Sequence, residues 1–349
     1  MQNKSYLLFL TMIAICIVGL AECNPYVVPR PTPASYHLPS KISGLSEIWS
    51  LTNIYTEQDD YMPKMVASAG KVLFVGSISN DHEDRLICLD GSSGKVSWER
   101  VDPRYEERGR LRVISATHGE FYAGYSGVPS VKKLELSTGD VLWSQSLSGR
   151  GFVYLFVIGN EIQISTTPEW FSKLYAESGV VIENVQGREI YISTPRITIS
   201  PILMNELQAE ETATGKLIWR VRLDHQLRMA PLFTEDLIYL RSGRTMGSLY
   251  AVQLSTGNIL WKTDNIVISN ITISPSKKLA YVLTRDGKLL GIDMDSGVIT
   301  TLIEFSNGPF TLNGEDIVGG YELAYDPTTR YLFILLGDSR QLFAFKEEE

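Results

Sequence analysis

The stretch that decides the fold is Leu249-Tyr-Ala-Val-Gln-Leu-Ser-Thr-Gly-Asn-Ile-Leu-Trp261. Its first half, Leu249 to Leu254, alternates apolar residues with polar or small ones, which is typical of a half-buried strand. Ser255-Thr256-Gly257 predicts a tight turn, because glycine takes a positive φ at little cost. Ile259 to Trp261 then begin a returning strand. The stretch therefore predicts a β-hairpin.

Copies of this hairpin recur along the chain. In four copies a tryptophan follows the turn glycine by four residues: Gly94 and Trp98, Gly139 and Trp143, Gly215 and Trp219, Gly257 and Trp261. Two weaker copies, around Gly179 and Gly297, carry Glu183 and Thr301 at the tryptophan position. The turn glycines are 36 to 45 residues apart. A period of about 40 residues with four short strands per unit indicates a β-propeller.

The two ends of the chain contain complementary halves of one more hairpin. Ser46-Glu-Ile-Trp-Ser-Leu51 matches the returning strand, with Trp49 in the repeat position, and Gln341 to Phe345 matches the outgoing strand. We expect the two to pair, with Trp49 beside Phe345, because pairing removes two open sheet edges. The sequence thus predicts an all-β, seven-bladed β-propeller of four-stranded antiparallel blades, closed by an N-terminal strand that completes the last blade.

The expected boundaries follow from this frame. Six blades are expected at residues 62–102, 110–147, 150–186, 188–223, 226–264 and 267–305, and the seventh combines 321–345 with 47–51. Residues 1–23 are expected to be a signal peptide, 24–45 a proline-rich extended leader without packed structure, and 46–349 a single propeller domain. Lys4, an apolar core and small residues near Ala21 fit a cleaved signal. A membrane anchor, or a lipoprotein signal ending at Cys23, is the alternative.

Composition limits the classes of partner. Hydrophobic residues make up 44% and charged residues 21%, which is ordinary for a globular chain. The net charge of −8 and the lack of any basic run longer than a pair such as Lys277-Lys278 argue against a nucleic acid or an anionic membrane. Among three cysteines, Cys88 lies in an expected strand and is predicted to be a buried apolar side chain. Asn270-Ile-Thr272 is an N-glycosylation sequon.

The repeat resembles that of pyrroloquinoline-quinone-type propellers. Its elements are an acidic or amide residue four positions before the turn glycine, then Ser or Thr and glycine, then tryptophan; the first position holds Asp90, Glu135, Glu211, Gln253 and Asp293. The resemblance covers about residues 46–349. It implies an architectural role for these positions, in which the acidic group accepts hydrogen bonds from turn amides and the tryptophan packs between blades. The structural repeat residues are Trp49, Trp98, Trp143, Trp219, Trp261, Gly94, Gly139, Gly215 and Gly257.

This family contains both quinoprotein dehydrogenases and non-enzymatic members, such as the outer-membrane assembly lipoprotein and lumenal propellers of endoplasmic-reticulum proteins. The dehydrogenases have eight blades, a vicinal disulfide and a calcium site. Here seven blades are predicted, no two cysteines are adjacent, and no Cys-x-x-Cys-His haem motif occurs. We therefore expect a protein that is not an enzyme and has no cofactor or metal, with a quinone- or metal-dependent oxidoreductase as the alternative.

Other chemical signals are weak. The four histidines, His37, His82, His118 and His225, have no partner at metal-ligand or triad spacing. Asp81-His-Glu-Asp84 is the one cluster that could hold a cation, and a solvated loop is the alternative.

A binding surface is expected on the face formed by the second-to-third-strand loops and the connections between blades, because the opposite face holds only compact turns. Its candidate contact residues are Tyr61, Tyr105, Glu106, Trp170 and Phe310. Trp170 is the one tryptophan outside the repeat phase. Acidic loops with aromatics suit a protein or peptide partner and are compatible with a basic one, unless the acidic groups serve only solubility. We expect a monomeric interaction scaffold without a membrane span after signal cleavage, either secreted or in the secretory-pathway lumen, with the periplasm as the alternative.

Overall fold

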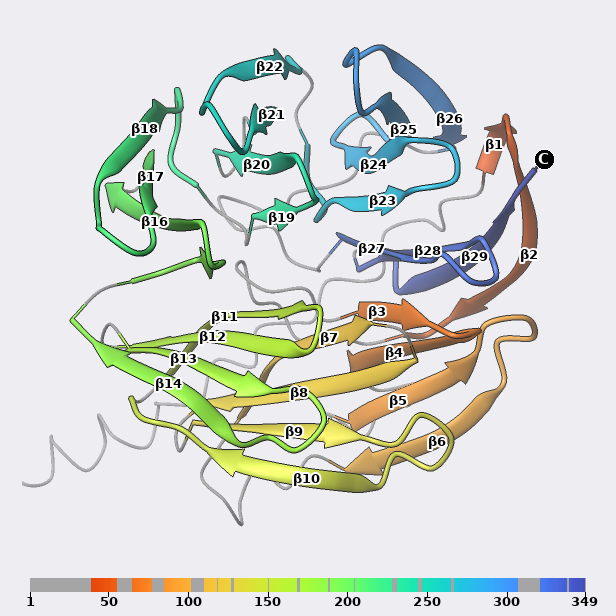
Figure 1. Cartoon of the computed structure of the whole chain (residues 1–349). Coiled ribbons are helices and arrows are strands. Elements are labelled where there is room, and N and C mark those ends of the chain that lie inside the picture. Colours follow the sequence, from red (N-terminus) through yellow and green to blue (C-terminus); the bar gives the residue numbers. More distant parts are fainter. Residues whose placement is uncertain are drawn as a thin grey trace, which may run out of the picture. The chain divides into compact units, whose positions relative to one another are not determined.

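A computed structural model of the chain describes residues 39–54, 65–76, 85–101, 110–117, 119–126, 129–149, 151–167, 170–187, 189–203, 205–227, 231–243, 247–264, 267–306, 321–337 and 339–348. Residue contacts separate Met1–Ala34 from a compact unit, Ser35–Glu349. The expected signal peptide and most of the expected leader lie outside the described residues. Among the described residues every regular element is a β-strand (Figure 1), and none forms a helix able to cross a membrane.

The strands form seven antiparallel sheets, here called blades 1 to 7. Blade 1 contains β3 (Met65–Ser68), β4 (Lys71–Gly76), β5 (Arg85–Asp90) and β6 (Val96–Val101). Blade 2 contains β7 (Arg110–Thr117), β8 (Glu120–Ser126), β9 (Ser130–Leu134) and β10 (Val141–Ser146). Blade 3 contains β11 (Gly151–Ile158), β12 (Glu161–Thr167), β13 (Trp170–Tyr175) and β14 (Val181–Gln186). Blade 4 contains β15 (Ile192–Ser193), β16 (Ile197–Leu203), β17 (Glu206–Glu211) and β18 (Leu217–Arg222).

The remaining blades follow the same order. Blade 5 contains β19 (Leu232–Phe233), β20 (Leu237–Ser242), β21 (Ser248–Gln253) and β22 (Ile259–Lys262). Blade 6 contains β23 (Thr272–Ser274), β24 (Leu279–Thr284), β25 (Lys288–Asp293) and β26 (Ile299–Phe305), and blade 7 contains β27 (Tyr321–Asp326), β28 (Tyr331–Leu336), β29 (Gln341–Glu347) and β2 (Leu45–Thr52). These sheets confirm the predicted seven-bladed β-propeller.

The N-terminal strand completes blade 7 as predicted, since β2 pairs antiparallel with β29. The residue partners differ from the expectation: Trp49 lies opposite Ala344, and Phe345 lies opposite Glu47. A bulge between Glu47 and Trp49 sets this register: without its extra residue Trp49 would lie opposite Phe343, and with it Trp49 stops at Ala344, one place short of the expected partner.

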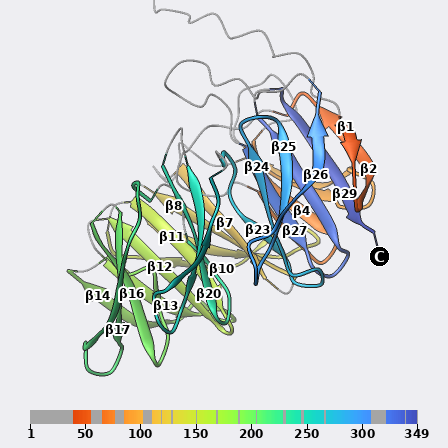
Figure 2. The ribbon, with the colours of Figure 1, turned by 90° about the horizontal axis from the view of Figure 1, so that it is seen from above.

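The segment expected to be an unpacked leader ends in a strand that the sequence did not predict. β1 (Pro39–Ile42) pairs with β26, so blade 6 has a fifth strand at its outer edge. Viewed from above, β1 and β2 run beside β26 and β29 (Figure 2). The N-terminal residues therefore cover the edges of two successive blades.

Apolar side chains join each blade to the next. Shared clusters of buried residues connect blades 1 and 2, blades 2 to 5, blades 5 and 6, blades 6 and 7, and blades 7 and 1. The last of these places Val72 and Phe74 of β4 in one cluster with Phe333 and Leu342 of blade 7. The ring is thus closed by apolar packing as well as by strand pairing.

A buried carboxylate fastens the end of β29. Glu347 is 2% exposed and accepts hydrogen bonds from Ser276 Oγ at 3.0 Å, from Tyr325 Oη at 2.8 Å and from Tyr281 Oη. The Nε of Arg330 lies 3.7 Å from its Oε2. Burial opposes the charge, but the surrounding serine and tyrosine hydroxyls outweigh it and hold the pKa of Glu347 below its ordinary value of 4.5.

We expect Glu347→Gln to lower the free energy of unfolding by about 1–3 kcal/mol at neutral pH, because the buried hydroxyls lose a charged acceptor. Since the folded-state pKa is lowered, the stabilisation is present above pH 4.5 and is lost as the pH falls through the folded pKa. Denaturant unfolding at neutral and acidic pH should show the gap between wild type and variant closing in acid. The exposed neighbour Glu348→Gln is the control and should change little; a pH-independent gap would contradict the assignment.

Candidate interaction surfaces

The tryptophans in the repeat position join successive blades at their rims. The ring of each lies on the turn glycine of the following blade, where an added Cβ would come within 2.6 to 2.9 Å of the indole; the pairs are Trp49 and Gly94, Trp98 and Gly139, Trp143 and Gly179, Trp219 and Gly257, and Trp261 and Gly297. Each indole N–H also donates to the carbonyl three residues before that glycine, at 2.8 to 3.3 Å. The predicted packing between blades is confirmed.

A bulge in the outer strand sets the position of each tryptophan. In β6, for example, Trp98 pairs with Cys88 while Val96 pairs with Leu89, so Ser97 is an extra residue. The same shift precedes Trp143, Trp219 and Trp261. Because a bulge bends the strand and re-aims the next side chain, it is a means of directing the indole to the neighbouring blade.

The residue four before the turn glycine braces the turn. Asp90 Oδ1 accepts from the backbone N–H of Ser92 and Ser93 at 3.1 and 3.2 Å, and hydrogen bonding from Ser92 lowers its pKa. Asp293 accepts from the N–H of Ser296 at 2.7 Å. The longer side chains instead accept from turn hydroxyls, as Glu135 does from Thr138 at 2.9 Å. Contacts to turn amides are therefore confirmed for the aspartates only.

The seam between blades 3 and 4 departs from this pattern. Blade 3 has Glu183 at the tryptophan position, and its carboxylate pairs with Lys173 Nζ at 3.1 Å. Gly215 keeps the turn conformation at φ +69°, yet an added Cβ would meet nothing within 4 Å. Within the described residues no donor reaches the carbonyl of Thr212, three residues before Gly215. Gly215 therefore keeps the conformation expected of a turn glycine, but unlike the other turn glycines of the repeat it carries no indole.

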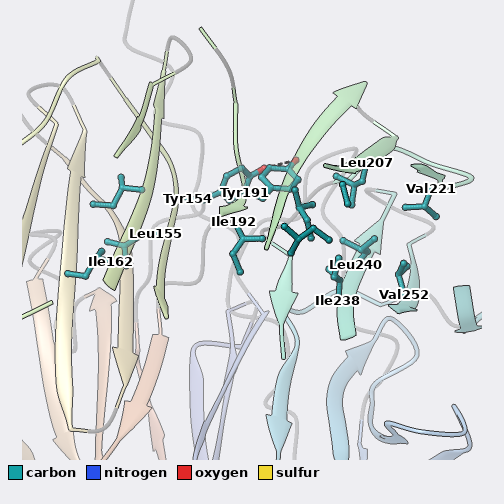
Figure 3. Close-up of a cluster of buried hydrophobic side chains, with 14 of the residues drawn as sticks. Tyr154, Leu155, Ile162, Tyr191, Ile192, Leu207, Val221, Ile238, Leu240 and Val252 are labelled. Carbon is teal, nitrogen blue, oxygen red and sulfur yellow. Dashed lines mark hydrogen bonds between the residues drawn. The ribbon is translucent and has the colours of Figure 1, made fainter. Parts of the chain in front are cut away.

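Blades 3 and 4 are held together from the inside instead. Gln163 of β12 is 1% exposed; its Nε2 donates to Ser193 O at 2.6 Å, and its Oε1 accepts from Ser193 N at 2.8 Å. Tyr154 and Tyr191 stack edge to face at 4.6 Å, with their hydroxyls 3.3 Å apart (Figure 3). Burial raises the pKa of Tyr191, so its hydroxyl stays protonated at neutral pH. These contacts fix the inner seam and leave its rim open.

Trp170 differs from the other five tryptophans. It was expected in a loop, but it is the first residue of β13, opposite Thr166 of β12 and Gln186 of β14. It is partly exposed, and no hydrogen-bond partner for its indole N–H occurs among the described residues. The strand pairing places it at the end of blade 3 where the β12–β13 loop lies. This is the face on which the partner was predicted to bind.

The other candidate contact residues, Tyr61, Tyr105, Glu106 and Phe310, lie outside the described residues, as does the cluster Asp81-His-Glu-Asp84. His225 is described and is exposed. In the described part of the chain, no three His, Cys, Asp or Glu side chains gather closely enough to hold a metal ion.

The side chains of Cys88 and Asn270 both take part in holding the fold together. Cys88 is fully buried as predicted, and burial raises the pKa of its thiol to about 12. Asn270 Nδ2 donates to Leu323 O at 2.8 Å, and its Oδ1 accepts from Leu323 N at 2.7 Å, so the side chain joins blade 6 to blade 7. Sequence reasoning missed this role because a sequon carries no information about a partner 53 residues away. Glycosylation of Asn270 stays a prediction.

Comparison with known proteins supports the repeat assignment. A family model for the outer membrane protein assembly factor BamB, built on PQQ-type repeats, matches residues 130–309. A chain of a mitotic checkpoint complex crystal structure has a TM-score of 0.65 at 13% identity, covering 91% of this chain and 96% of that one. BamB from Moraxella catarrhalis has a TM-score of 0.50 at 11% identity, covering 86% and 99%. At these identities the likeness shows the fold alone. No curated protein sequence matches the chain.

The open seam gives a matched pair of substitutions. Gly139 and Gly215 have similar φ values, +74° and +69°, so alanine adds similar backbone strain of about 1–2 kcal/mol at both. At Gly139 the new methyl also collides with Trp98, which adds about 1–3 kcal/mol. Urea unfolding should therefore show Gly139→Ala to be clearly less stable than Gly215→Ala. Equal losses would mean that the indole contact contributes nothing.

Proposed function

Because this chain belongs to the family of the outer membrane protein assembly factor BamB, we propose that it is a non-catalytic scaffold that binds a protein or peptide partner on the face carrying the inter-blade loops. The two structures compared above are a chain of a mitotic checkpoint complex and BamB, and the family model describes BamB as an assembly factor. The repeat residues serve architecture, so the partner must contact other residues. Loops on a rigid scaffold are where such contacts usually form.

One observation carries the proposal: Trp170 is partly exposed, and among the described residues its indole neither lies on a turn glycine nor donates a hydrogen bond. The repeat tryptophans bind a glycine turn and a carbonyl of the next blade, whereas the Trp170 N–H has no partner among the described residues. Antiparallel pairing on both sides holds its backbone in β13, so binding costs little further backbone entropy there. Rigid tryptophans of this kind dominate binding energy at protein interfaces.

The proposed location is a compartment outside the cytoplasm, reached through the predicted signal peptide at residues 1–23. The secretory-pathway lumen and the periplasm are the candidates, and kinship with an outer membrane assembly factor favours the periplasm. A monomer suffices for the proposed role, because one rigid ring presents all of its loops without a second copy.

We expect Trp170→Ala to abolish capture of the partner while the melting temperature stays nearly unchanged. Quantitative mass spectrometry of pull-downs from the secretory or periplasmic fraction measures the first, and thermal unfolding the second. Val298→Ala, which removes an apolar side chain 62% exposed on the opposite face, is the matched control and should keep the partner. Trp98→Ala should instead cost about 3–5 kcal/mol of stability, as for a buried aromatic. A Trp170→Ala protein that melts like Trp98→Ala, or binds like wild type, would contradict the proposal.

The alternative of a quinone- or metal-dependent oxidoreductase has its own test. We expect the purified protein to be colourless, without a quinone absorption band and without calcium in metal analysis. A stoichiometric quinone with calcium would overturn the scaffold proposal.

A further inference from the structure

The open rim between blades 3 and 4 repeats a binding site that the chain fills elsewhere with its own side chains. At five seams the same turn receives an indole, which stacks on the turn glycine and donates to the carbonyl three residues earlier. Blade 4 has both halves of this site, Gly215 at φ +69° and the Thr212 carbonyl, but blade 3 offers Glu183 in place of tryptophan. The other five seams therefore indicate that the ligand for this turn is an indole.

We propose that the Gly215 turn is a docking notch for a tryptophan side chain of a separate partner protein. The indole would lie on Gly215 and donate to Thr212 O, as Trp98 does to Gly139 and Leu136 O at 2.8 Å. One chemical group, an aromatic ring that carries an N–H, can both donate a hydrogen bond to the Thr212 carbonyl and pack on the open face of Gly215.

The surroundings of the notch indicate what flanks this tryptophan. A groove of about 530 Å³ lies beside Gly215, and residues on both sides of the glycine, Glu211, Ala213 and Lys216, line it together with Arg196, Pro195 and the first residues of β18. Arg196 and Lys216 have no ion-pair partner among the described residues, whereas Glu211 accepts from Thr214 Oγ1 at 2.5 Å. Acidic residues next to the tryptophan would complement the two free cations.

Exposed apolar residues alone would not support this assignment. Leu217 and Ile218 are 45% and 47% exposed, but Leu142, Leu260 and Ile299 at the same places in other blades are 56%, 47% and 40% exposed. What distinguishes blade 4 is the missing indole. The inner contacts of Gln163 and Ser193 hold blades 3 and 4 together without it, so the notch can stand open in a stable ring.

The test uses the full chain and a short peptide, acetyl-Asp-Trp-Asp-amide, with 5-fluorotryptophan as a ¹⁹F reporter. Wild type should broaden and shift the ¹⁹F line saturably. A phenylalanine or alanine peptide should compete poorly, because neither has the N–H donor. Gly215→Ala places a methyl where the ring stacks, and Glu183→Trp fills the notch from blade 3; both should weaken binding about tenfold or more.

Gly159→Ala is the matched control, since Gly159 has φ +58° and equally open space but lies in a turn that receives no indole. It should bind like wild type. Thermal unfolding confirms that each variant is folded, and Glu183→Trp should also raise the melting temperature by restoring a seam. No saturable binding by wild type, or equal binding by folded Gly215→Ala, would overturn the proposal. Self-association that Gly215→Ala abolishes would identify a second copy as the occupant and would also overturn it.

Discussion

The structure depends on the contact between an indole and a turn glycine. Each indole packs directly on the turn glycine, which has no side chain to prevent the contact. Its N–H donates to a carbonyl of the same turn that takes no part in strand pairing. The contact acts between blades, whereas the strand ladders act within them. Tryptophan and glycine are therefore coupled positions: a methyl on the glycine has no room where the ring lies, and without the ring the carbonyl loses its donor.

The propeller joins neighbouring blades in three ways. Most blades use the indole, and blades 3 and 4 replace it with buried polar contacts of Gln163 and with the Tyr154–Tyr191 pair. Blades 6 and 7 have neither, because Thr301 stands at the tryptophan position; Asn270 and Glu347 join them instead. Fully satisfied polar groups of this kind specify one arrangement of neighbouring blades, since an alternative arrangement would leave them buried without partners. Uniform repeats thus coexist with local differences in how the rim is closed.

The sequence predicted the fold well because its strongest signal is periodic. Tryptophan and glycine at fixed spacing predicted the number of blades, their limits within a few residues, and the pairing of Trp49's strand with β29. It failed where a feature depends on a partner distant in the chain. β1 lies in a proline-rich segment whose pairing with β26 has no local signal, and the register that places Trp49 opposite Ala344 depends on a bulge in β2 that the repeat spacing does not predict. The sequence shows Glu183 at the tryptophan position, but only the geometry shows the consequence, which is open space above Gly215.

The pairing of β1 with β26 and of β2 with β29 has a consequence for biosynthesis. A ribosome makes these two strands some 250 residues before their partners, so the early strands have open edges while the intervening blades are translated. An incomplete chain displays those edges and a finished one hides them. The early strands thus depend on the later blades for protection against edge-to-edge aggregation.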